Sequence, residues 1–235
     1  MSKLTDEICR LLDSTTEEER RFVLDYLRQR MPIHPIEAEW NTSAESILAA
    51  IARSSDLTQR GIRGILAEAT FEQWILPKIA LASWQWLAVP DDQPYDFVLS
   101  KGTARARVQV KLQRKERGQP KQYAARSKKR LSNAPENLYV VEVQKTRSGT
   151  KSGRQTRPYR FSDFDILAVN LHPSTGDWKR FVYTVANWLL PRGPKPKLIE
   201  IFQPVATESD KYWTDDLSTC LNWFLGDEDK RLYQR

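Results

Sequence analysis

The chain has 235 residues, of which 40% are hydrophobic and 10% aromatic, a composition that suits a globular protein with one large core. Its two cysteines, Cys9 and Cys220, are too few for a disulfide framework or a cysteine zinc site, and they suit a reducing compartment. No apolar run approaches the roughly 20 residues of a membrane span, and the N-terminal MSKLTDEICRLLDS lacks the plan of a signal peptide. We therefore expect a soluble, cytoplasmic protein that does not act at a membrane.

The formal net charge of +7 hides an uneven distribution. Residues 101–160 contain 18 Lys and Arg against three acids, a net +15, so the other 175 residues carry −8. A uniform excess would indicate only solubility, whereas charge concentrated in one segment indicates a face that meets a polyanion. The distribution favours nucleic acid as the partner over a merely solvated basic surface.

The first part of the chain predicts helices. Residues 3–30 carry apolar stripes typical of two short helices, and residues 43–53 predict another. A longer helix is expected from about residue 58 to residue 76, ending before Pro77. We expect residues 1–56 to form a helical N-terminal lobe, and residues 84–89 remain unassigned between helix and strand.

The following segments change to the periodicity of strands. Residues 96–99 and 105–113 predict a hairpin with its turn at residues 101–102, and residues 138–143 and 166–171 predict further strands. Residues 181–190 fit either a helix or a strand, and residues 198–202 predict a closing strand. Residues 145–157, KTRSGTKSGRQTR, contain no apolar residue and predict a mobile basic loop. The fold class expected for residues 57–235 is therefore α/β, a mixed sheet flanked by helices.

Three polar side chains stand out in the predicted hairpin. Asp96 opens one strand, and Gln109 and Lys111 lie two residues apart on the next, so both point to the same face. The twelve residues between Asp96 and Gln109 suffice to close one hairpin and bring the three together. Phosphodiester hydrolysis needs a metal ion held by oxygen ligands and a group that orients the attacking water, and Mg²⁺ takes few side-chain ligands. Packing gives two apolar strands no reason to place a carboxylate, an amide and an ammonium on one face, whereas a metal site does.

The pattern Asp-x12-Gln-x-Lys resembles the motif of the PD-(D/E)XK nuclease superfamily, over about residues 58–145. The resemblance implies a restriction-endonuclease-like fold, in which Asp96 and Gln109 bind the metal and Lys111 orients or activates water. The family often adds a glutamate from the preceding helix, and Glu68 is the matching residue, with Glu72 one turn further on as the alternative. Two departures are visible: Tyr95 precedes Asp96 where the family has proline, and the neutral Gln109 replaces the second carboxylate. Asp96 and Glu68 must then supply the negative charge.

The resemblance also implies an activity. It implies cleavage of double-stranded DNA with Mg²⁺, or Mn²⁺ in its place, and the compact chain looks most like a prokaryotic type II restriction endonuclease that cuts at a short specific site. Such enzymes act as homodimers on palindromic sites, and four C-terminal aromatic residues are expected at the dimer interface. These are Tyr212, Trp213, Trp223 and Phe224. The alternatives are a junction resolvase, a transposase subunit, a homing enzyme, or a non-catalytic DNA-binding module.

The residues after Lys111 are rich in side chains that bind DNA. Phosphate contacts, which give affinity without sequence information, are expected from the first group. They are Gln113, Arg114, Lys115, Arg117, Lys121, Arg126, Lys128, Lys129 and Arg130. Base contacts are expected from the basic loop. Its candidates are Lys145, Arg147, Lys151, Arg154, Gln155 and Arg157.

Plainer interpretations stay open at this stage. Gln109 and Lys111 could form the solvated face of an edge strand, and Asp96 could cap a turn. Asp91 or Asp92 could replace Asp96 as the ligand. Asp163 and Asp165 more simply position the start of a buried strand than form a second acidic pair. Two histidines are too few for an HNH nuclease or a histidine metal cluster, and the sequence contains no Walker A loop and no GxGxxG motif.

Overall fold

The computed structural model describes residues 2–30, 34–87, 89–90, 93–124, 131, 134–145, 150–151, 154–155 and 157–233, with the backbone alone at 150–151 and 154–155. The chain divides into two compact units, Met1–Arg60 and Gly61–Arg235. The division falls inside helix α5 (Asp56–Thr70). Within these described residues no helix combines the length and the apolar character needed to cross a membrane.

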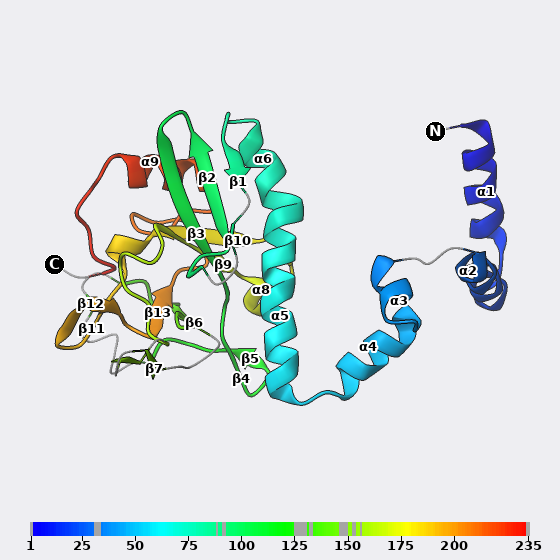
Figure 1. The fold of residues 1–235 in the computed structure, drawn as a ribbon, viewed down its shortest axis with the longest axis horizontal. Helices are drawn as coiled ribbons and strands as arrows, with labels where there is room; N and C mark the ends of the chain where they lie inside the picture. Colours follow the sequence, from blue (N-terminus) through cyan, green and yellow to red (C-terminus); the bar gives the residue numbers. More distant parts are fainter. Residues whose placement is uncertain are drawn as a thin grey trace. The chain divides into compact units, whose positions relative to one another are not determined.

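The Met1–Arg60 unit is helical, as the sequence predicts (Figure 1). Thr16 and Glu19 form a reciprocal capping box before α2, in which each side chain accepts from the other residue's backbone N–H. None of the first four helices contains a buried residue. These helices are α1 (Lys3–Ser14), α2 (Glu17–Arg30), α3 (Pro35–Glu39) and α4 (Ala44–Arg53).

The Gly61–Arg235 unit is built on a five-stranded mixed sheet. Its order is β1-β2-β3-β9-β10, in which β3 and β9 run parallel and the other neighbours antiparallel. The predicted hairpin is β2–β3, and its turn uses Gly102 at φ +60°, a left-handed conformation that favours glycine. The strands are β1 (Gln85–Leu87), β2 (Phe97–Lys101), β3 (Ala104–Leu112), β9 (Ile166–Asn170) and β10 (Phe181–Val185).

Helices flank this sheet, and one of them extends further than the sequence predicts. After α5 the chain continues through a π-helical turn, η1 (Phe71–Ile75), into α6 (Leu76–Ala80), along the sheet (Figure 1). Phe71 anchors this run in the core, with its ring 5.1 Å from Phe97 and 5.6 Å from Phe181. The predicted end before Pro77 is wrong because Pro77 lies in the first turn of α6, where its missing N–H is not needed. Helix α9 (Leu217–Leu225) contacts β9 and β10.

A second pair of strands meets the far end of β3. Strand β6 (Tyr139–Glu142) pairs with β13 (Phe202–Val205), and the Arg114 N–H donates to the Val140 carbonyl at 2.8 Å. Several predicted elements are confirmed here: residues 138–143 and 166–171 contain β6 and β9, and residues 181–190 contain a strand followed by a 3₁₀ turn. The predicted strand 198–202 instead spans the end of β12 and the start of β13.

Short elements complete the unit, among them a hairpin inside the predicted basic loop. They are β4 (Lys115–Glu116), β5 (Gln119–Pro120), β7 (Thr150–Lys151), β8 (Arg154–Gln155), α8 (His172–Thr175), η2 (Ala186–Trp188), β11 (Pro191–Arg192) and β12 (Lys195–Ile199).

Candidate active site

The candidate site lies at a fork in the sheet, which is the point where β2 stops pairing with β3 and the two strands separate. Strand β3 runs on beyond the start of β2, whose pairing ends where the Asp96 N–H donates to the Val108 carbonyl at 2.9 Å. Strand β6 joins the same edge of β3 only at Gln113 and Arg114. Within the described part of the chain, residues 109–112 therefore have no strand partner on this edge. Gln109 and Lys111 lie within this gap, and Asp96 lies at its border.

The Asp96 carboxylate binds the first backbone N–H of β3 that lacks a strand partner. Its Oδ2 accepts from the Val110 backbone N–H at 2.7 Å and from Gln109 Nε2 at 2.5 Å. A side chain thus replaces the β2 carbonyl that would otherwise satisfy Val110. The interpretation of Asp96 as a turn cap is wrong, because its side chain bonds to Gln109 and Val110 of β3.

Gln109 is a buried residue rather than part of a solvated strand face, with only 2% of its surface exposed. Its carboxamide makes three hydrogen bonds. Nε2 donates to Asp96 and, at 3.2 Å, to the Val110 carbonyl, while Oε1 accepts from the Tyr159 hydroxyl at 3.0 Å. Tyr159 was missed by sequence reasoning, because it follows the basic loop and belongs to no periodic pattern.

Glu68 completes the charge cluster from helix α5. Burial raises its pKa, the negative charge of Asp96 raises it as well and Lys111 opposes the shift, and together they bring the pKa to about 7. The Glu72 side chain, the alternative one turn on, is exposed on η1. The helix phase therefore selects Glu68 as the acid that is electrostatically coupled to Asp96 and Lys111.

The other two charges in the cluster are also shifted by burial. Burial raises the pKa of the Asp96 carboxyl, and the Lys111 ammonium and the hydrogen bonds from Val110 and Gln109 partly offset this shift. Burial lowers the pKa of Lys111, against the attraction of Asp96 and Glu68. Shifts that make charged forms costly in one small region are typical of functional sites.

The donor set fits a hard divalent cation that keeps some of its water. The described residues contain no group of three or more His, Cys, Asp and Glu side chains placed to hold a metal, so the cluster offers two carboxylates, Asp96 and Glu68. Mg²⁺ is commonly bound through one or two carboxylates together with substrate phosphates. Two desolvated carboxylates against one lysine also leave an excess of negative charge that a cation would offset. Asp91 and Asp92 lie outside the described residues.

Lys145 lies beside this cluster, although the sequence placed it at the start of a loop for base contacts. Its Nζ is 5.3 Å from the centre of the Tyr159 ring and 3.4 Å from a carboxylate oxygen of Asp163. The Lys111 Nζ lies 5.7 Å from the same ring. Tyr159 therefore has two ammonium groups near its ring as well as a hydroxyl bonded to Gln109.

The residues predicted to contact phosphates have different surroundings. Gln113 is buried, 1% exposed, and neither polar atom of its amide has a hydrogen-bond partner, so its placement on a phosphate-facing surface is wrong. Arg114 forms an ion pair with Glu142, and Lys121 pairs with Glu116 at 2.7 Å. Lys115 and Arg117 are exposed, as is Arg157 from the second group. The remaining predicted contacts lie outside the described residues or their described side chains: Arg126, Lys128, Lys129, Arg130, Arg147, Lys151, Arg154 and Gln155.

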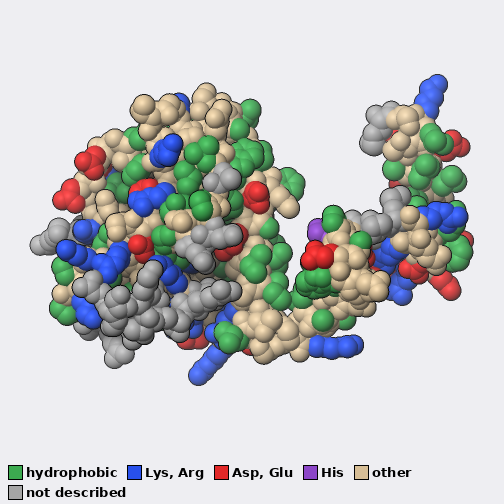
Figure 2. Space-filling model, in the orientation of Figure 1, with side chains coloured by type: hydrophobic (Ala, Val, Ile, Leu, Met, Phe, Trp, Pro, Cys, Tyr) green, Lys and Arg blue, Asp and Glu red, His purple; other side chains and the backbone are tan. Residues whose placement is uncertain are grey.

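A basic hairpin next to Tyr159 was missed because the charge count stopped at residue 160. Hairpin β11–β12 exposes Lys195 and Lys197, and the adjoining Ile199 N–H donates to the Tyr159 carbonyl at 2.9 Å. Figure 2 shows Lys and Arg side chains gathered over the part of this unit that carries β11 and β12. The signal available in the sequence was the segment PRGPKPK, which contains three cations and no acid.

Two of the four C-terminal aromatic residues are not free for a dimer interface. Trp213 is fully buried and Tyr212 is 5% exposed, both within the hydrophobic core. Trp223 and Phe224 are partly buried against that core. The expectation of an interface role is therefore wrong for Tyr212 and Trp213, which fill the core of this unit, and stays a prediction for Trp223 and Phe224.

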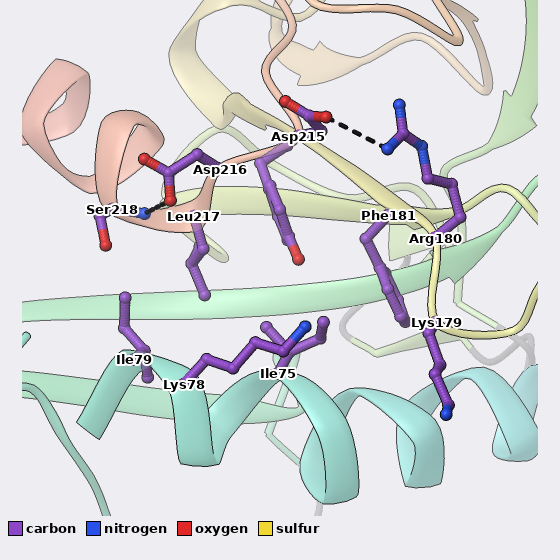
Figure 3. Close-up of a pocket in the computed structure, with 11 residues that line it drawn as sticks. Ile75, Lys78, Ile79, Lys179, Arg180, Phe181, Asp215, Asp216, Leu217 and Ser218 are labelled. Carbon is purple, nitrogen blue, oxygen red and sulfur yellow. Dashed lines mark hydrogen bonds and ion pairs between the residues drawn. The ribbon is translucent and has the colours of Figure 1, made fainter. Parts of the chain in front are cut away.

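A separate pocket of about 250 Å³ lies between α6 and the start of α9 (Figure 3). None of Glu68, Asp96, Gln109 and Lys111 lines it. Three of its charged groups are already engaged: Arg180 pairs with Asp215 at 3.2 Å, and the Asp216 carboxylate accepts from the first N–H groups of α9. This pocket is therefore distinct from the charge cluster and supplies none of its chemistry.

Comparisons with known proteins do not identify the function of this chain. No protein-family model and no curated protein matches the chain. Among solved structures, the bacterial homing endonuclease I-Ssp6803I aligns with 19% sequence identity and a TM-score of 0.38, over 70% of this chain and 90% of that one. A superposition this loose transfers neither residues nor activity.

Proposed function

We propose that the chain is a Mg²⁺-dependent endonuclease that hydrolyses phosphodiester bonds of double-stranded DNA, with Mn²⁺ able to substitute. The observation that carries this proposal is the fork of β2 and β3, where Asp96, Gln109 and Lys111 meet and Glu68 is coupled to them. The exposed cations Lys115, just after β3, and Lys197, two residues before the Ile199 that bonds to Tyr159, supply a surface for a polyanion.

The roles follow from the chemistry of each group. Asp96 and Glu68 would hold the cation. Gln109, expected from the sequence as a further ligand, would instead fix the Asp96 carboxylate in place, because its Oε1 accepts from Tyr159 and its Nε2 donates to Asp96. The bound cation would offset the charge that develops on the scissile phosphate. Lys111, whose pKa burial lowers, would orient the attacking water and take part in its deprotonation. Lys145 beside Tyr159 would approach the adjacent phosphate.

A catalytic role explains the cluster better than a non-catalytic DNA-binding module does. Burying two carboxylates and a lysine in one gap costs folding free energy, and a binding surface needs only exposed cations. Within the nuclease class we propose a type II restriction endonuclease that acts as a homodimer, since one site per chain cuts one strand and a twofold assembly matches a palindrome. A junction resolvase, a transposase subunit and a homing enzyme are the alternatives.

The test is cleavage of supercoiled plasmid and phage DNA by the purified chain in Mg²⁺ and in Mn²⁺. We expect Asp96→Asn, Lys111→Met and Glu68→Gln each to lower the cleavage rate at least about 100-fold, because each removes a group acting on the developing charge. Glu72→Gln is the matched control, since it removes an exposed acid one helical turn away and should leave the rate unchanged. DNA affinity, measured by fluorescence anisotropy, should survive in all four variants.

The outcomes separate the alternatives. Discrete phage fragments support restriction, whereas cleavage confined to four-way junctions supports a resolvase. Binding without cleavage in either metal, or full activity in Asp96→Asn, contradicts the proposal.

A further inference from the structure

The hydrogen bonds around Gln109 allow one orientation of its carboxamide. The Val110 N–H donates to Asp96 Oδ2, which makes this carboxylate oxygen an acceptor. The amide edge that lies 2.5 Å from the same oxygen must then be the NH₂ group, because an ionised carboxylate only accepts. Gln109 Oε1 consequently faces Tyr159, and the Tyr159 hydroxyl must donate to it.

Tyr159 is held firmly enough to play this part. Its ring is 4% exposed and packs edge-on against Phe164 with the ring centres 5.3 Å apart. Its carbonyl accepts from the Ile199 N–H. Burial, together with the charges of Asp96, Asp163 and Glu68, raises the pKa of its hydroxyl, so the group keeps its proton and stays a donor.

We infer that Tyr159 is a positioning residue that acts through Gln109: its hydroxyl fixes the carboxamide, and the carboxamide fixes the Asp96 carboxylate at the end of the fork. This inference rests on the proposed function. It also gives a reason for the neutral residue at position 109. A carboxylate in the place of Gln109 would set two acceptors at 2.5 Å with no proton between them, whereas the amide supplies a donor to Asp96 and an acceptor to Tyr159.

Cleavage kinetics of a double-mutant cycle test the inference. We expect Tyr159→Phe to lower kcat by about 10- to 100-fold with little change in KM, the usual size of effect when a group that orients a ligand is lost. Gln109→Met, which keeps the volume and removes both polar atoms, should lower kcat at least as much. The double variant should be no slower than Gln109→Met alone, because the hydroxyl acts only through the amide.

Tyr233→Phe is the matched control. Its hydroxyl donates to Asp210 at 2.7 Å, so this variant also loses one buried tyrosine hydrogen bond. A loss of stability with an unchanged kcat is expected there. Wild-type kcat in Tyr159→Phe overturns the inference, and so does a double variant whose loss is the product of the two single losses.

An NMR measurement keeps the inference testable without cleavage. In glutamine-labelled protein, the Gln109 side-chain NH₂ signal is identified by its disappearance in Gln109→Met. We expect Tyr159→Phe to shift this signal and speed its exchange with water, and Tyr233→Phe to leave it in place. An unmoved signal in Tyr159→Phe refutes the positioning role. Absence of cleavage in the wild type, with the shift present, refutes the proposed nuclease activity alone.

Discussion

Two groups of charges lie four residues apart on β3, and they differ in whether their surroundings favour the charged forms. At Arg107 the guanidinium donates to both carboxylate oxygens of Asp165 at 2.7 and 2.9 Å, and to the Ser162 carbonyl at 2.7 Å. The backbone joins the pair, since the Arg107 N–H donates to Asp165 and the Asp165 N–H donates to the Arg107 carbonyl. This pairing raises the pKa of Arg107, which favours its charged form.

At Lys111 the arrangement is the reverse. Burial lowers the pKa of this lysine and raises those of Glu68 and Asp96, so the charged form of each group is costly. The comparison teaches how to interpret a cluster of charges on a strand. When opposite charges pair and stabilise one another, the cluster has a structural role, and when like charges are buried in excess, it indicates a functional site. It also supports the expectation that Asp165 positions the start of a buried strand.

The largest loss of stability from a substitution should come from the satisfied pair. Asp165→Asn removes the charge that Arg107 needs, and we expect the free energy of unfolding to fall by about 2 kcal/mol, between the values for exposed and buried pairs because Arg107 is partly exposed. Urea unfolding measures this change. The kcat of the folded variant should equal that of the wild type, and a lost kcat with normal stability would reverse the comparison.

A pH-dependent effect is expected from the excess charge at Glu68. Its folded pKa of about 7 lies above the ordinary 4.5, so the folded state holds more protons between these values. The free energy of unfolding should therefore fall as pH rises from about 4.5 to about 7 in metal-free buffer. Glu68→Gln should flatten this decline, measured by urea unfolding at several pH values, while Glu72→Gln should keep it. Equal slopes in wild type and Glu68→Gln would contradict the assignment.

The smallest change in stability is predicted at Gln113, which directly follows the end of β3. Both polar atoms of its buried amide lack a hydrogen-bond partner. Gln113→Met replaces a buried, unsatisfied amide by an apolar side chain of similar size. We expect a gain of about 1 kcal/mol in the free energy of unfolding, seen as a higher Tm. A loss of stability would show that the amide does have a partner in solution.

Much of the sheet was predictable because the strands carry strict signals. Val108, Val110 and Leu112 alternate with polar residues, and Gly102 marks the turn, so the hairpin and the meeting of Asp96 with Gln109 followed from the sequence. Strand β1 was not assigned, because three exposed residues at a sheet edge have no periodicity to read.

Only the part of the candidate site that depends on the spacing of residues within strands and helices could be predicted from the sequence. Spacing brought Asp96, Gln109 and Lys111 together and favoured Glu68 with Glu72 as the alternative, and the path of the helix against the sheet separates these two. The Tyr159 hydroxyl depends on a contact 50 residues away in the chain, which no local pattern encodes. The burial of Trp213 and Gln113 likewise depends on how the C-terminal segment and β6 fold back, which composition does not reveal.

The π-helical turn at Phe71–Ile75 has a consequence for how such a site can arise. In this turn the Leu76 N–H bonds to the carbonyl of Phe71, five residues back, so the helix takes in one more residue than an α-helix would. One residue corresponds to a rotation of roughly 100° about the helix axis. The turn of helix carrying Glu68 therefore has its own angular phase relative to the buried Leu76 and Ile79. A one-residue insertion in a helix can thus turn an acid such as Glu68 toward a sheet while the buried residues after the insertion, here Leu76 and Ile79, keep their positions.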